Sequence, residues 1–350
     1  MRRSYVVAMA AVAWLGCQVQ VEEAAVQGSE VLSTGQEIIN GTPASLGQFP
    51  WQARWEGPFG MLCNGSLIHP SWVLTTATCA MVGANPANMW IVLGDLEQFG
   101  PAEPTQQGRS ASRIVIHPGY DLVSGEPVND LALIKLSTPA TLNSAVQTIA
   151  IQSATASNTL HTVSGWGGTY YGDTSSSNVL RYASIPVTSN ASCDGAPLGR
   201  DLLPGELCAG YLNGYDGACH HDTGAPLITQ GSPPQQVGIV SWGRGDCNTY
   251  TVFTRLSSYA SWIDGHVNCV PCPMANSWYD GANCYVASPP AGTTAFIYNN
   301  NLYYTALPGN QCPLSGSWYD GANCYVGWPP AGTTAFVYNN NLYYTPVCQP

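Results

Sequence analysis

The run Trp72-Val73-Leu74-Thr75 is short, mostly apolar and built from residues that favour β-strands. Similar runs recur at Ile114-Val115-Ile116, Leu131-Ala132-Leu133-Ile134 and Val237-Gly238-Ile239-Val240, separated by segments rich in glycine, proline, asparagine and serine. Short strands at regular spacing, without a long helical period, predict an all-β fold built as an antiparallel barrel or sandwich. One short helix is expected to follow over residues 257–267, where four side chains are spaced for a single face: Tyr259, Trp262, Ile263 and His266.

The composition limits the possible partners and the compartment. Of the 350 residues only 9% are charged, and the formal net charge is −11. This acidic balance argues against a nucleic-acid partner, because binding to a phosphate backbone requires basic patches. The 13 cysteines, 37 glycines and 26 prolines indicate a loop-rich, disulfide-stapled protein of an oxidising compartment. We expect no metal or other cofactor, because the adjacent His220 and His221 offer two ligands without a third.

The first 17 residues are typical of an export signal, since two arginines precede an apolar run, residues 5–15, that is too short to span a membrane. The run ends in Leu15-Gly16-Cys17, which resembles the lipobox of bacterial lipoproteins. Lipidation of Cys17 would leave an even number of cysteines. The alternative is ordinary signal cleavage before Glu22, and residues 18–37 are a polar leader in either case. We therefore expect an exported protein, secreted or held at a bacterial outer surface or in the periplasm, that meets the membrane only through a lipid anchor.

Beyond residue 268 the chain repeats itself with a period of 40 residues, so that Cys272-Pro273 aligns with Cys312-Pro313. We predict a main domain over residues 38–268 and two tandem copies, residues 269–308 and 309–350. Each copy is too small for a core of its own and needs a staple. The six cysteines of the two copies allow 15 connectivities. The repeat favours Cys272–Cys284 and Cys312–Cys324, which leaves Cys269 and Cys348 for each other.

Aromatic residues and asparagines crowd the two copies, as in Asn299-Asn300-Asn301 beside Tyr303-Tyr304. Aromatic faces next to amides suit sugar rings, and two copies would add avidity, which predicts attachment to a cell-surface glycan. The alternative is that most aromatics pack around the disulfides as a core. Three residues would then remain as candidates for exposure: Trp278, Trp318 and Trp328.

The main domain carries several motifs in a fixed order: Ile38-Ile39-Asn40-Gly41, Cys63-Asn64-Gly65-Ser66, Thr76-Ala77-Thr78-Cys79, Asn129-Asp130-Leu131-Ala132, Ser164-Gly165-Trp166-Gly167, Asp222-Thr223-Gly224 and Ser241-Trp242-Gly243. Together they resemble the trypsin-like serine proteases. The resemblance implies two six-stranded antiparallel β-barrels with the active-site cleft between them. It also implies three disulfides: Cys63–Cys79, Cys193–Cys208 and Cys219–Cys247.

The same resemblance indicates that the catalytic residues are replaced. Acyl transfer in this family requires a hydroxyl nucleophile, an imidazole base and a buried carboxylate. Thr78 stands where the family has histidine, Thr223 where it has serine, and only Asp130 is kept. The backbone at His221 and Thr223 corresponds to the oxyanion hole, and His221 replaces a glycine there, so its Cβ is expected to strain the backbone.

The resemblance to this family also implies which residues form the substrate pocket and the activation site. The pocket positions are Gly217, Ser241, Trp242, Gly243 and Thr251. Gly217, at the pocket floor, offers no carboxylate for lysine or arginine, so we expect apolar or small side chains to be preferred. Activation in the family is a cut before the residue matching Ile38, whose new ammonium would pair with Asp222. The alternative is that both residues are relics of an active ancestor.

None of the six histidines is expected to replace the missing base: His69, His117, His161, His220, His221 and His266. The sequence therefore predicts a catalytically inactive serine-protease homologue that acts as an extracellular binding or regulatory protein. Its partner would be a protein or peptide in the degenerate cleft, with a surface glycan on the repeats. The alternative is a secreted trypsin-like hydrolase that uses Thr223 as its nucleophile.

Overall fold

The computed structural model describes residues 38–56, 62–82, 85–154, 159–195, 197–213, 216–268, 274, 277–279, 284–307, 310–330 and 333–344. The predicted export signal with Cys17, the predicted leader, and Cys269, Cys272 and Cys348 lie outside these ranges. No helix within them has the length and apolar character needed to cross a bilayer.

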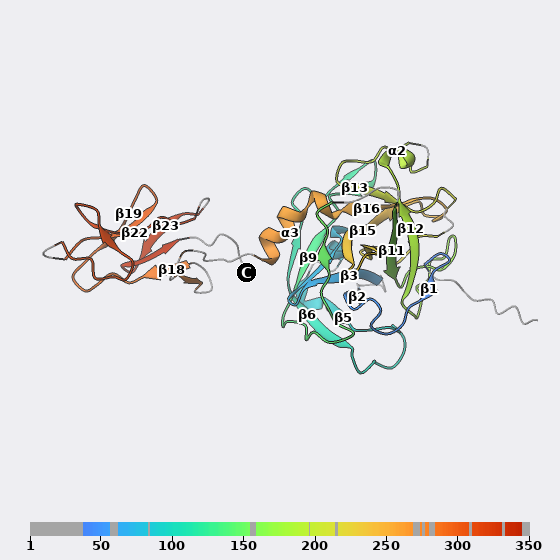
Figure 1. Cartoon of the computed structure of the whole chain (residues 1–350), viewed down its shortest axis with the longest axis horizontal. Helices are drawn as coiled ribbons and strands as arrows, with labels where there is room; N and C mark the ends of the chain where they lie inside the picture. The colour runs from blue at the N-terminus through green and yellow to red at the C-terminus, as the bar shows by residue number, and fades with distance from the viewer. Residues whose placement is uncertain are drawn as a thin grey trace, which may run out of the picture. The chain divides into compact units, whose positions relative to one another are not determined.

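The first half of the main domain is a closed barrel of six antiparallel strands (Figure 1). Around the barrel the strands follow the order β2-β3-β4-β9-β6-β5. Their bounds are β2 (Gln52–Glu56), β3 (Leu62–His69), β4 (Trp72–Thr75), β5 (Trp90–Leu93), β6 (Gln107–Ile116) and β9 (Ala132–Leu136). Bulky apolar side chains such as Trp55, Leu67 and Ile91 fill its interior and are almost fully buried. The strand runs read from the sequence are thus the walls of a packed core.

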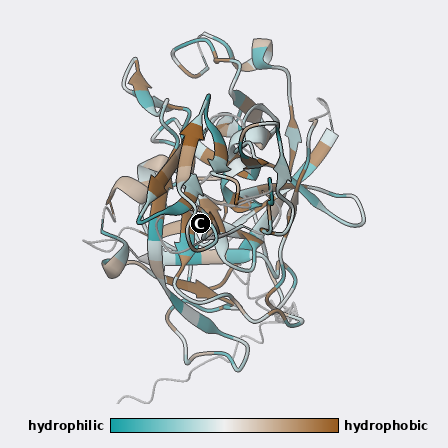
Figure 2. Ribbon diagram, turned by 90° about the vertical axis from the view of Figure 1, so that its left-hand side faces the viewer, coloured by the Kyte–Doolittle hydropathy of each residue, from teal (hydrophilic) through white to brown (hydrophobic). Residues whose placement is uncertain are grey.

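The second half is also a six-stranded antiparallel barrel, which closes where β12 pairs with β13. Its strands are β11 (Thr159–Gly165), β12 (Arg181–Val187), β13 (Glu206–Ala209), β14 (Pro226–Thr229), β15 (Gln235–Gly243) and β16 (Thr251–Arg255). Two short strands join its edges: β1 (Thr42–Pro43) and β10 (Ala150–Ile151). Ile38, Val163, Leu227 and Phe253 are fully buried in its core. Figure 2 shows apolar residues gathered on the strands and polar ones on many of the loops.

Few other elements complete the domain: β7 (Asp121–Val123), β8 (Glu126–Val128), α1 (Ala77–Val82), α2 (Asn190–Cys193), η2 (Pro86–Asn88), η3 (Leu256–Ser258) and α3 (Ala260–Val267). The predicted closing helix is therefore α3, and the first residues of the expected range form the 3₁₀ turn η3 instead. Tyr259 and Ile263 are buried in one apolar cluster, with Trp262 packed against it. The predicted fold class, two six-stranded barrels and a short C-terminal helix, is confirmed.

Disulfides join Cys63 to Cys79, Cys193 to Cys208 and Cys219 to Cys247 in the main domain, and Cys312 to Cys324 in the repeats. Cys284 is also disulfide-bonded, while Cys272, its predicted partner, lies outside the described residues. These bonds indicate an extracellular protein, since such disulfides persist in oxidising compartments.

The C-terminal region forms two four-stranded sheets, and each sheet combines strands of both repeats. One has the order β17-β18-β24-β23 and the other β19-β20-β22-β21. The first copy supplies β17 (Trp278–Tyr279), β18 (Cys284–Ala287), β19 (Ala295–Tyr298) and β20 (Asn301–Tyr304). The second supplies β21 (Trp318–Tyr319), β22 (Cys324–Gly327), β23 (Ala335–Tyr338) and β24 (Asn341–Tyr344). A boundary at residues 308/309 therefore divides strands that share a sheet.

Asn300 and Asn340 fasten the two copies to each other. Asn300 accepts a hydrogen bond from the Ala335 N–H at 2.7 Å and donates one to the Thr333 carbonyl at 3.0 Å. Asn340 makes the equivalent pair of bonds to the first copy, at 2.7 and 3.1 Å. Both asparagines have a positive φ, which asparagine tolerates better than most residues. The amides that we expected to face a ligand serve the structure at these two positions.

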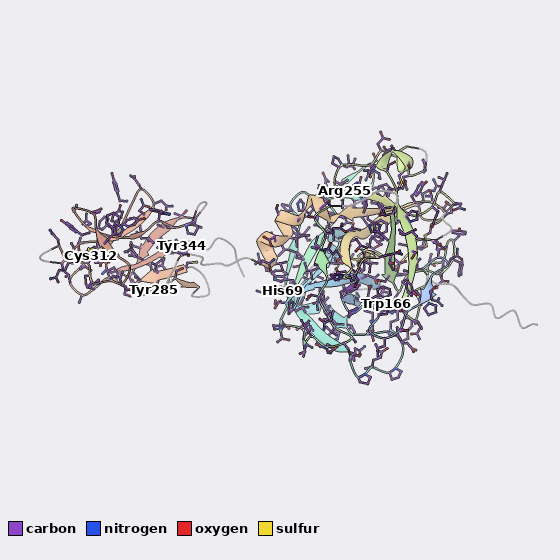
Figure 3. The ribbon with its side chains drawn as sticks, viewed as in Figure 1. His69, Trp166, Arg255, Tyr285, Cys312 and Tyr344 are labelled. Carbon is purple, nitrogen blue, oxygen red and sulfur yellow. A yellow bond between two sulfur atoms is a disulfide. The ribbon has the colours of Figure 1, made fainter. Side chains whose placement is uncertain are left out.

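Small and aliphatic side chains form most of the core between the two sheets, including Leu302, Leu342, Ala295 and Ala335. Among the aromatic side chains described in the repeats, only Tyr304, Tyr325 and Tyr344 are buried (Tyr344 is labelled in Figure 3). The expectation that most aromatics form this core is therefore wrong. Trp318 and Trp328 are 55% and 72% exposed, as predicted, and the side chain of Trp278 is outside the described set.

Candidate functional site

Asp130 lies just before β9, is 1% exposed and accepts three hydrogen bonds through its carboxylate. Two come from Thr78, through the backbone N–H at 2.8 Å and Oγ1 at 3.0 Å. The third comes from Ser241 Oγ at 2.7 Å. Burial raises the pKa of Asp130, and these hydrogen bonds act in the opposite direction. Thr78 thus satisfies the carboxylate directly with a hydroxyl, a group that is too weak a base to accept a proton from an alcohol.

Thr78 and Thr223 line one cavity of about 230 Å³ between the two barrels. Leu62 and Cys63 of the first barrel form part of its wall. The Thr223 carbonyl accepts a hydrogen bond from the Asn64 N–H at 2.9 Å, which fixes the loop that carries Thr223 against β3. Within the described ranges, Thr223 Oγ1 has no hydrogen-bond partner, so nothing there activates it as a nucleophile.

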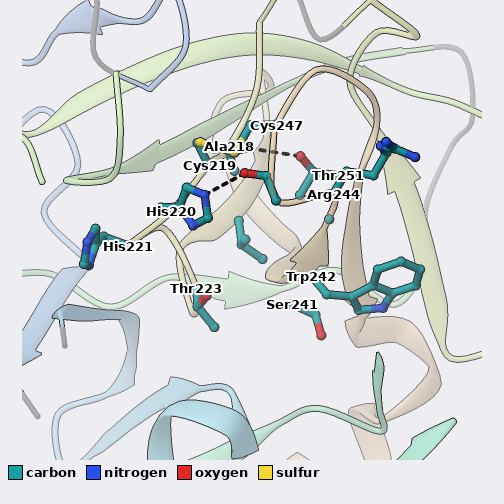
Figure 4. Close-up of a pocket in the computed structure, with 13 residues that line it drawn as sticks. Ala218, Cys219, His220, His221, Thr223, Ser241, Trp242, Arg244, Cys247 and Thr251 are labelled. Carbon is teal, nitrogen blue, oxygen red and sulfur yellow. Dashed lines mark hydrogen bonds between the residues drawn. A yellow bond between two sulfur atoms is a disulfide. The ribbon is translucent and has the colours of Figure 1, made fainter. Parts of the chain in front are cut away.

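Two histidines lie near Thr223 in the sequence, but both imidazole rings form hydrogen bonds to other parts of the domain. His220 Nε2 is 2.8 Å from the Gly245 carbonyl oxygen and His221 Nε2 is 2.7 Å from that of Thr174. Because a carbonyl only accepts hydrogen bonds, both nitrogens act as donors. Figure 4 shows the two rings directed away from the Thr223 side chain.

The other four histidines belong to other parts of the domain. His69 Nδ1 accepts a hydrogen bond from the Ser71 N–H at 3.1 Å, and His161 is buried on β11. His117 packs edge-on against Tyr259 at 5.1 Å, and His266 packs against Trp262 at 4.8 Å. These contacts keep the four rings with the barrel strands and with α3.

The backbone of the nucleophile loop keeps two unused donors. Among the described residues, neither the His221 N–H nor the Thr223 N–H donates a hydrogen bond. His221 has a φ of +67°, a region that glycine favours, so a strained non-glycine backbone holds this loop in shape. Gly224 follows with a φ of +87°, and a Cβ there would lie 2.1 Å from the Asn64 carbonyl oxygen. Two free N–H groups beside a cavity can bind a carbonyl oxygen.

A pocket of about 210 Å³ adjoins this loop (Figure 4). Four of the predicted pocket positions line it: Ser241, Trp242, Gly243 and Thr251. Gly217 is not among the residues that line this pocket, and its backbone pairs with Ile39 in a β-bridge. Its assignment to the pocket floor stays a prediction. Among the described residues that line the pocket there is no carboxylate. Arg244, which the sequence did not single out, is the one lysine or arginine among them. The pocket therefore disfavours lysine and arginine.

Asp222 is fully buried and receives hydrogen bonds from the Gly167 N–H at 2.8 Å and the Cys219 N–H at 3.0 Å. Burial raises its pKa to about 7. Gly165 and Gly167 make room for it, since a Cβ at either would lie 2.3 Å from a carboxylate atom of Asp222. No cation pairs with Asp222 among the described residues. In this uncut chain the Ile38 side chain is already fully buried in the second barrel.

Asn64 is a site residue that sequence reasoning missed. Its Nδ2 donates to the His221 carbonyl at 2.7 Å, beside the backbone bond that it makes to Thr223. Tyr120 is another, with its hydroxyl 3.4 Å from Thr78 Oγ1. Asn64 stands in the quoted motif Cys63-Asn64-Gly65-Ser66, whereas no local pattern marks Tyr120.

Cys219, His220 and Cys247 bring three potential metal-ligand atoms within 4.8 Å of one another. Cys219 and Cys247 form a disulfide, so neither sulfur is a thiolate that could bind a metal. This cluster therefore does not fit a metal site.

A two-barrel fold with a buried aspartate, a nucleophile loop and a lateral pocket in the same place is the architecture of trypsin-like serine proteases. Residues 38–263 match the trypsin family. A trypsin of Xenopus laevis is 31% identical over 243 residues, 69% of this chain and 95% of that protein, and trypsin-3 of Salmo salar is 34% identical over 230 residues, 65% and 91% respectively. Transmembrane protease serine 11C of Mus musculus is 32% identical over 242 residues, 67% of this chain but only 54%, about half, of that protein. The chain belongs to the trypsin family.

Proposed function

We propose that this protein is an exported, catalytically inactive member of the trypsin family that binds a protein or peptide in its cleft. The observation that carries the proposal is the hydrogen bond from Thr78 Oγ1 to Asp130 Oδ1, at 3.0 Å. It occupies the carboxylate that would otherwise orient an imidazole. Loss of serine or histidine from such a triad lowers kcat by ~10⁶, roughly 8 kcal/mol of transition-state stabilisation.

The cleft keeps groups that can bind a peptide, although it lacks a base that could drive catalysis. The N–H groups of His221 and Thr223 are free to hold a ligand carbonyl, and the adjoining pocket has space for a side chain. The absence of a carboxylate there and the guanidinium of Arg244 favour an apolar, small or acidic side chain. A peptide held in this way would be retained rather than cleaved.

Attachment to a surface is the second part of the proposal. Lipidation of Cys17 would tie the protein to a membrane, and a cut between Glu37 and Ile38 would release the domain while giving Asp222 an ammonium partner. Trp318 and Trp328 are exposed on the repeats, which favours a glycan partner there.

Hydrolysis can be tested with the chain produced so that Ile38 is its free N-terminus. We expect mixed peptide libraries and a hydroxyl-reactive phosphonate probe to give the same background signal for this protein and for its Thr223→Ala variant. A signal that disappears in Thr223→Ala would overturn the proposal and establish Thr223 as the nucleophile of a hydrolase.

Binding in the cleft needs a separate measurement. A peptide library panned on the full chain should yield sequences whose affinity falls in Gly243→Trp, which fills the pocket. The exposed substitution Gly265→Trp on α3, where a Cβ would meet nothing within 4 Å and φ is not positive, is the matched control. Equal binding to both variants would contradict the role assigned to the pocket.

A further inference from the structure

Four aromatic side chains form a continuous row across the sheet β19-β20-β22-β21, one from each strand. Strand register places Phe296 opposite Tyr303, Tyr303 opposite Tyr325, and Tyr325 opposite Trp318. Successive ring centroids are 5.4, 5.3 and 5.1 Å apart. On three of the strands a neighbouring residue enters the core, namely Ala295, Leu302 and Val326, so the row stands on the opposite, outer face. We call these four residues and Trp328 ladder B.

The other sheet carries the equivalent row, ladder A: Phe336, Tyr343, Tyr285 and Trp278, which are paired by the same register. The two ladders differ at one position, where the first copy has Ser288 and the second has Trp328. In ladder B the Trp328 ring packs at 6.0 Å from Tyr325 and is 72% exposed. Ladder A has no tryptophan there.

This one difference changes the hydrogen bonding of the central tyrosine. In ladder A the Tyr285 hydroxyl is 2.7 Å from Ser288 Oγ, which in turn bonds to Asn341 Oδ1 (Tyr285 is labelled in Figure 3). In ladder B, Tyr325 is 8% exposed and its hydroxyl has no hydrogen-bond partner. The side chain of Asn301, which is equivalent to Asn341, also has none among the described residues.

We propose that ladder B is a binding platform for an uncharged oligosaccharide chain. Sugar C–H groups carry a partial positive charge and pack on the negative faces of aromatic rings, as the edge of another ring does. A row that crosses four strands is about 14 Å long. It offers the rings of Phe296, Tyr303 and Trp318 to successive sugar rings, with the exposed Trp328 beside the buried Tyr325. The partly exposed Asn301 amide, which has no hydrogen-bond partner among the described residues, matches the hydroxyl groups of a sugar.

The charges of the repeat region favour a neutral ligand over an acidic one. Residues 270–350 contain no lysine or arginine, so they offer no cation to a uronate, a sulfate or a phosphate. Asp320, near the end of the ladder, already accepts hydrogen bonds from the N–H groups of Ala322 and Asn323. A proline-rich peptide also packs on aromatic rings, but it brings no hydroxyl groups for Asn301.

The inference deepens the surface-attachment part of the proposed function and assigns it to one ladder instead of two. It rests on that part alone and not on the inactivity of the cleft, which the Thr223→Ala comparison measures separately. Ladder A has its central hydroxyl satisfied and lacks the exposed tryptophan, so avidity between two equal sites is not expected.

The test is calorimetric titration of the full chain with cellohexaose, chitohexaose and xylohexaose, with hexagalacturonate as the acidic counterpart and decaproline as the peptide. We expect at least one neutral hexasaccharide to bind and Trp328→Ser to weaken it about tenfold, which is the scale of one lost aromatic contact. Because Trp328 is exposed, its replacement should leave the melting temperature unchanged. Ser288→Trp, the mirror change in ladder A, should keep or raise the affinity.

The amide is tested by Asn301→Ala, which should weaken sugar binding several-fold without lowering the melting temperature, since this side chain has no partner among the described residues. Asn341→Ala, the equivalent change in ladder A, is its control and should leave the affinity unchanged. The proposal is overturned if none of the three neutral hexasaccharides binds at millimolar concentration, if binding survives Trp328→Ser, or if decaproline or hexagalacturonate binds to ladder B more tightly than they do.

Discussion

At the scale of single residues, the proposed replacement of an imidazole by Thr78 leaves no buried charge unsatisfied. A carboxylate that is 1% exposed needs hydrogen-bond donors, and the backbone N–H and hydroxyl of Thr78 supply two of them. The loss of the base therefore does not require the loss of the fold. The cleft keeps its shape because the contacts that organise it involve Asp130, Ser241 and Asn64 rather than the missing histidine.

Because the contacts of Asp130, Ser241 and Asn64 still organise the cleft, we predict that catalysis can be restored. The triple variant Thr78→His, Thr223→Ser, His221→Gly returns the base, the nucleophile and the unstrained oxyanion backbone. On the chain that begins at Ile38, we expect it to hydrolyse peptide esters at least a hundredfold faster than the single variant Thr223→Ser, which lacks the base. Initial rates with a chromogenic ester measure this. Equal rates for the two variants would mean that the residues around Asp130 do not hold the restored histidine in a catalytic position.

Asp222 predicts a dependence of stability on pH. Burial raises its pKa to about 7 from the ordinary 3.8, so the folded chain holds this proton more tightly than the unfolded chain does. The stabilisation is fully present below pH 3.8 and is lost as the pH rises through about 7. Over this window the free energy of unfolding of the uncut chain should fall by roughly 4 kcal/mol on account of this group.

Urea unfolding at a series of pH values checks this, with Asp222→Asn as the comparison. The neutral asparagine should remove this part of the slope, whatever it does to the absolute stability. A chain that begins at Ile38 should also lose it, if its ammonium pairs with Asp222. An unchanged slope in Asp222→Asn would show that other groups cause the pH dependence.

Gly224 predicts a large loss of stability on substitution. In Gly224→Ala the new Cβ would lie 2.1 Å from the Asn64 carbonyl oxygen, at a φ of +87° that alanine disfavours. We expect a loss of at least about 3 kcal/mol, because the atom that it meets is backbone and cannot turn aside. Gly245→Ala, with nothing within 4 Å of its built Cβ, is the matched control and should change stability by less than about 1 kcal/mol. Similar losses in both variants would contradict this interpretation.

At the scale of elements, the exchange of strands between the repeats explains how such short copies fold. Two hairpins alone offer too little buried surface, whereas two four-stranded sheets enclose a common core. The pairing of β18 with β24 and of β20 with β22 supplies the central contact of each sheet. The two copies are therefore one folding unit.

A chain that ends at residue 308 should accordingly form a dimer. Its β18 and β20 would lack their partners β24 and β22 and expose pairing edges. Because the copies are nearly identical, β18 of one chain can pair with β20 of another and rebuild both sheets. Light scattering after size-exclusion chromatography gives the mass, with the full chain as a monomeric control. A monomer with an ordered repeat would contradict the prediction.

At the scale of the whole molecule, the barrels and the repeats have separate apolar cores. Leu302 and Leu342 lie in a cluster that contains no residue of the main domain among those described, and Leu67 and Phe253 lie in clusters that contain none of the repeats. We expect a chain that ends at residue 268 to keep the melting transition of the main domain within about 2 °C, because no core residue is removed. Differential scanning calorimetry compares it with the full chain. A much lower transition would show that the repeats stabilise the barrels.

The sequence alone determined the family fold and the duplication, and it predicts the replacement of the catalytic residues, because these depend on residue identity and on spacing along the chain. Strand runs predicted the barrels since each run is apolar enough to need a core, and Thr78 and Thr223 were visible as substitutions in ordered motifs.

Only the tertiary structure decided which strands of the repeats pair, that Gly217 forms a β-bridge with Ile39, and that the aromatic rows stand on outer faces. Two nearly identical copies present the same pairing edges, so no local pattern distinguishes pairing within a copy from pairing between copies. The buried environments of Asp130 and Asp222 likewise come from segments far apart in the chain, which meet only when the barrels close.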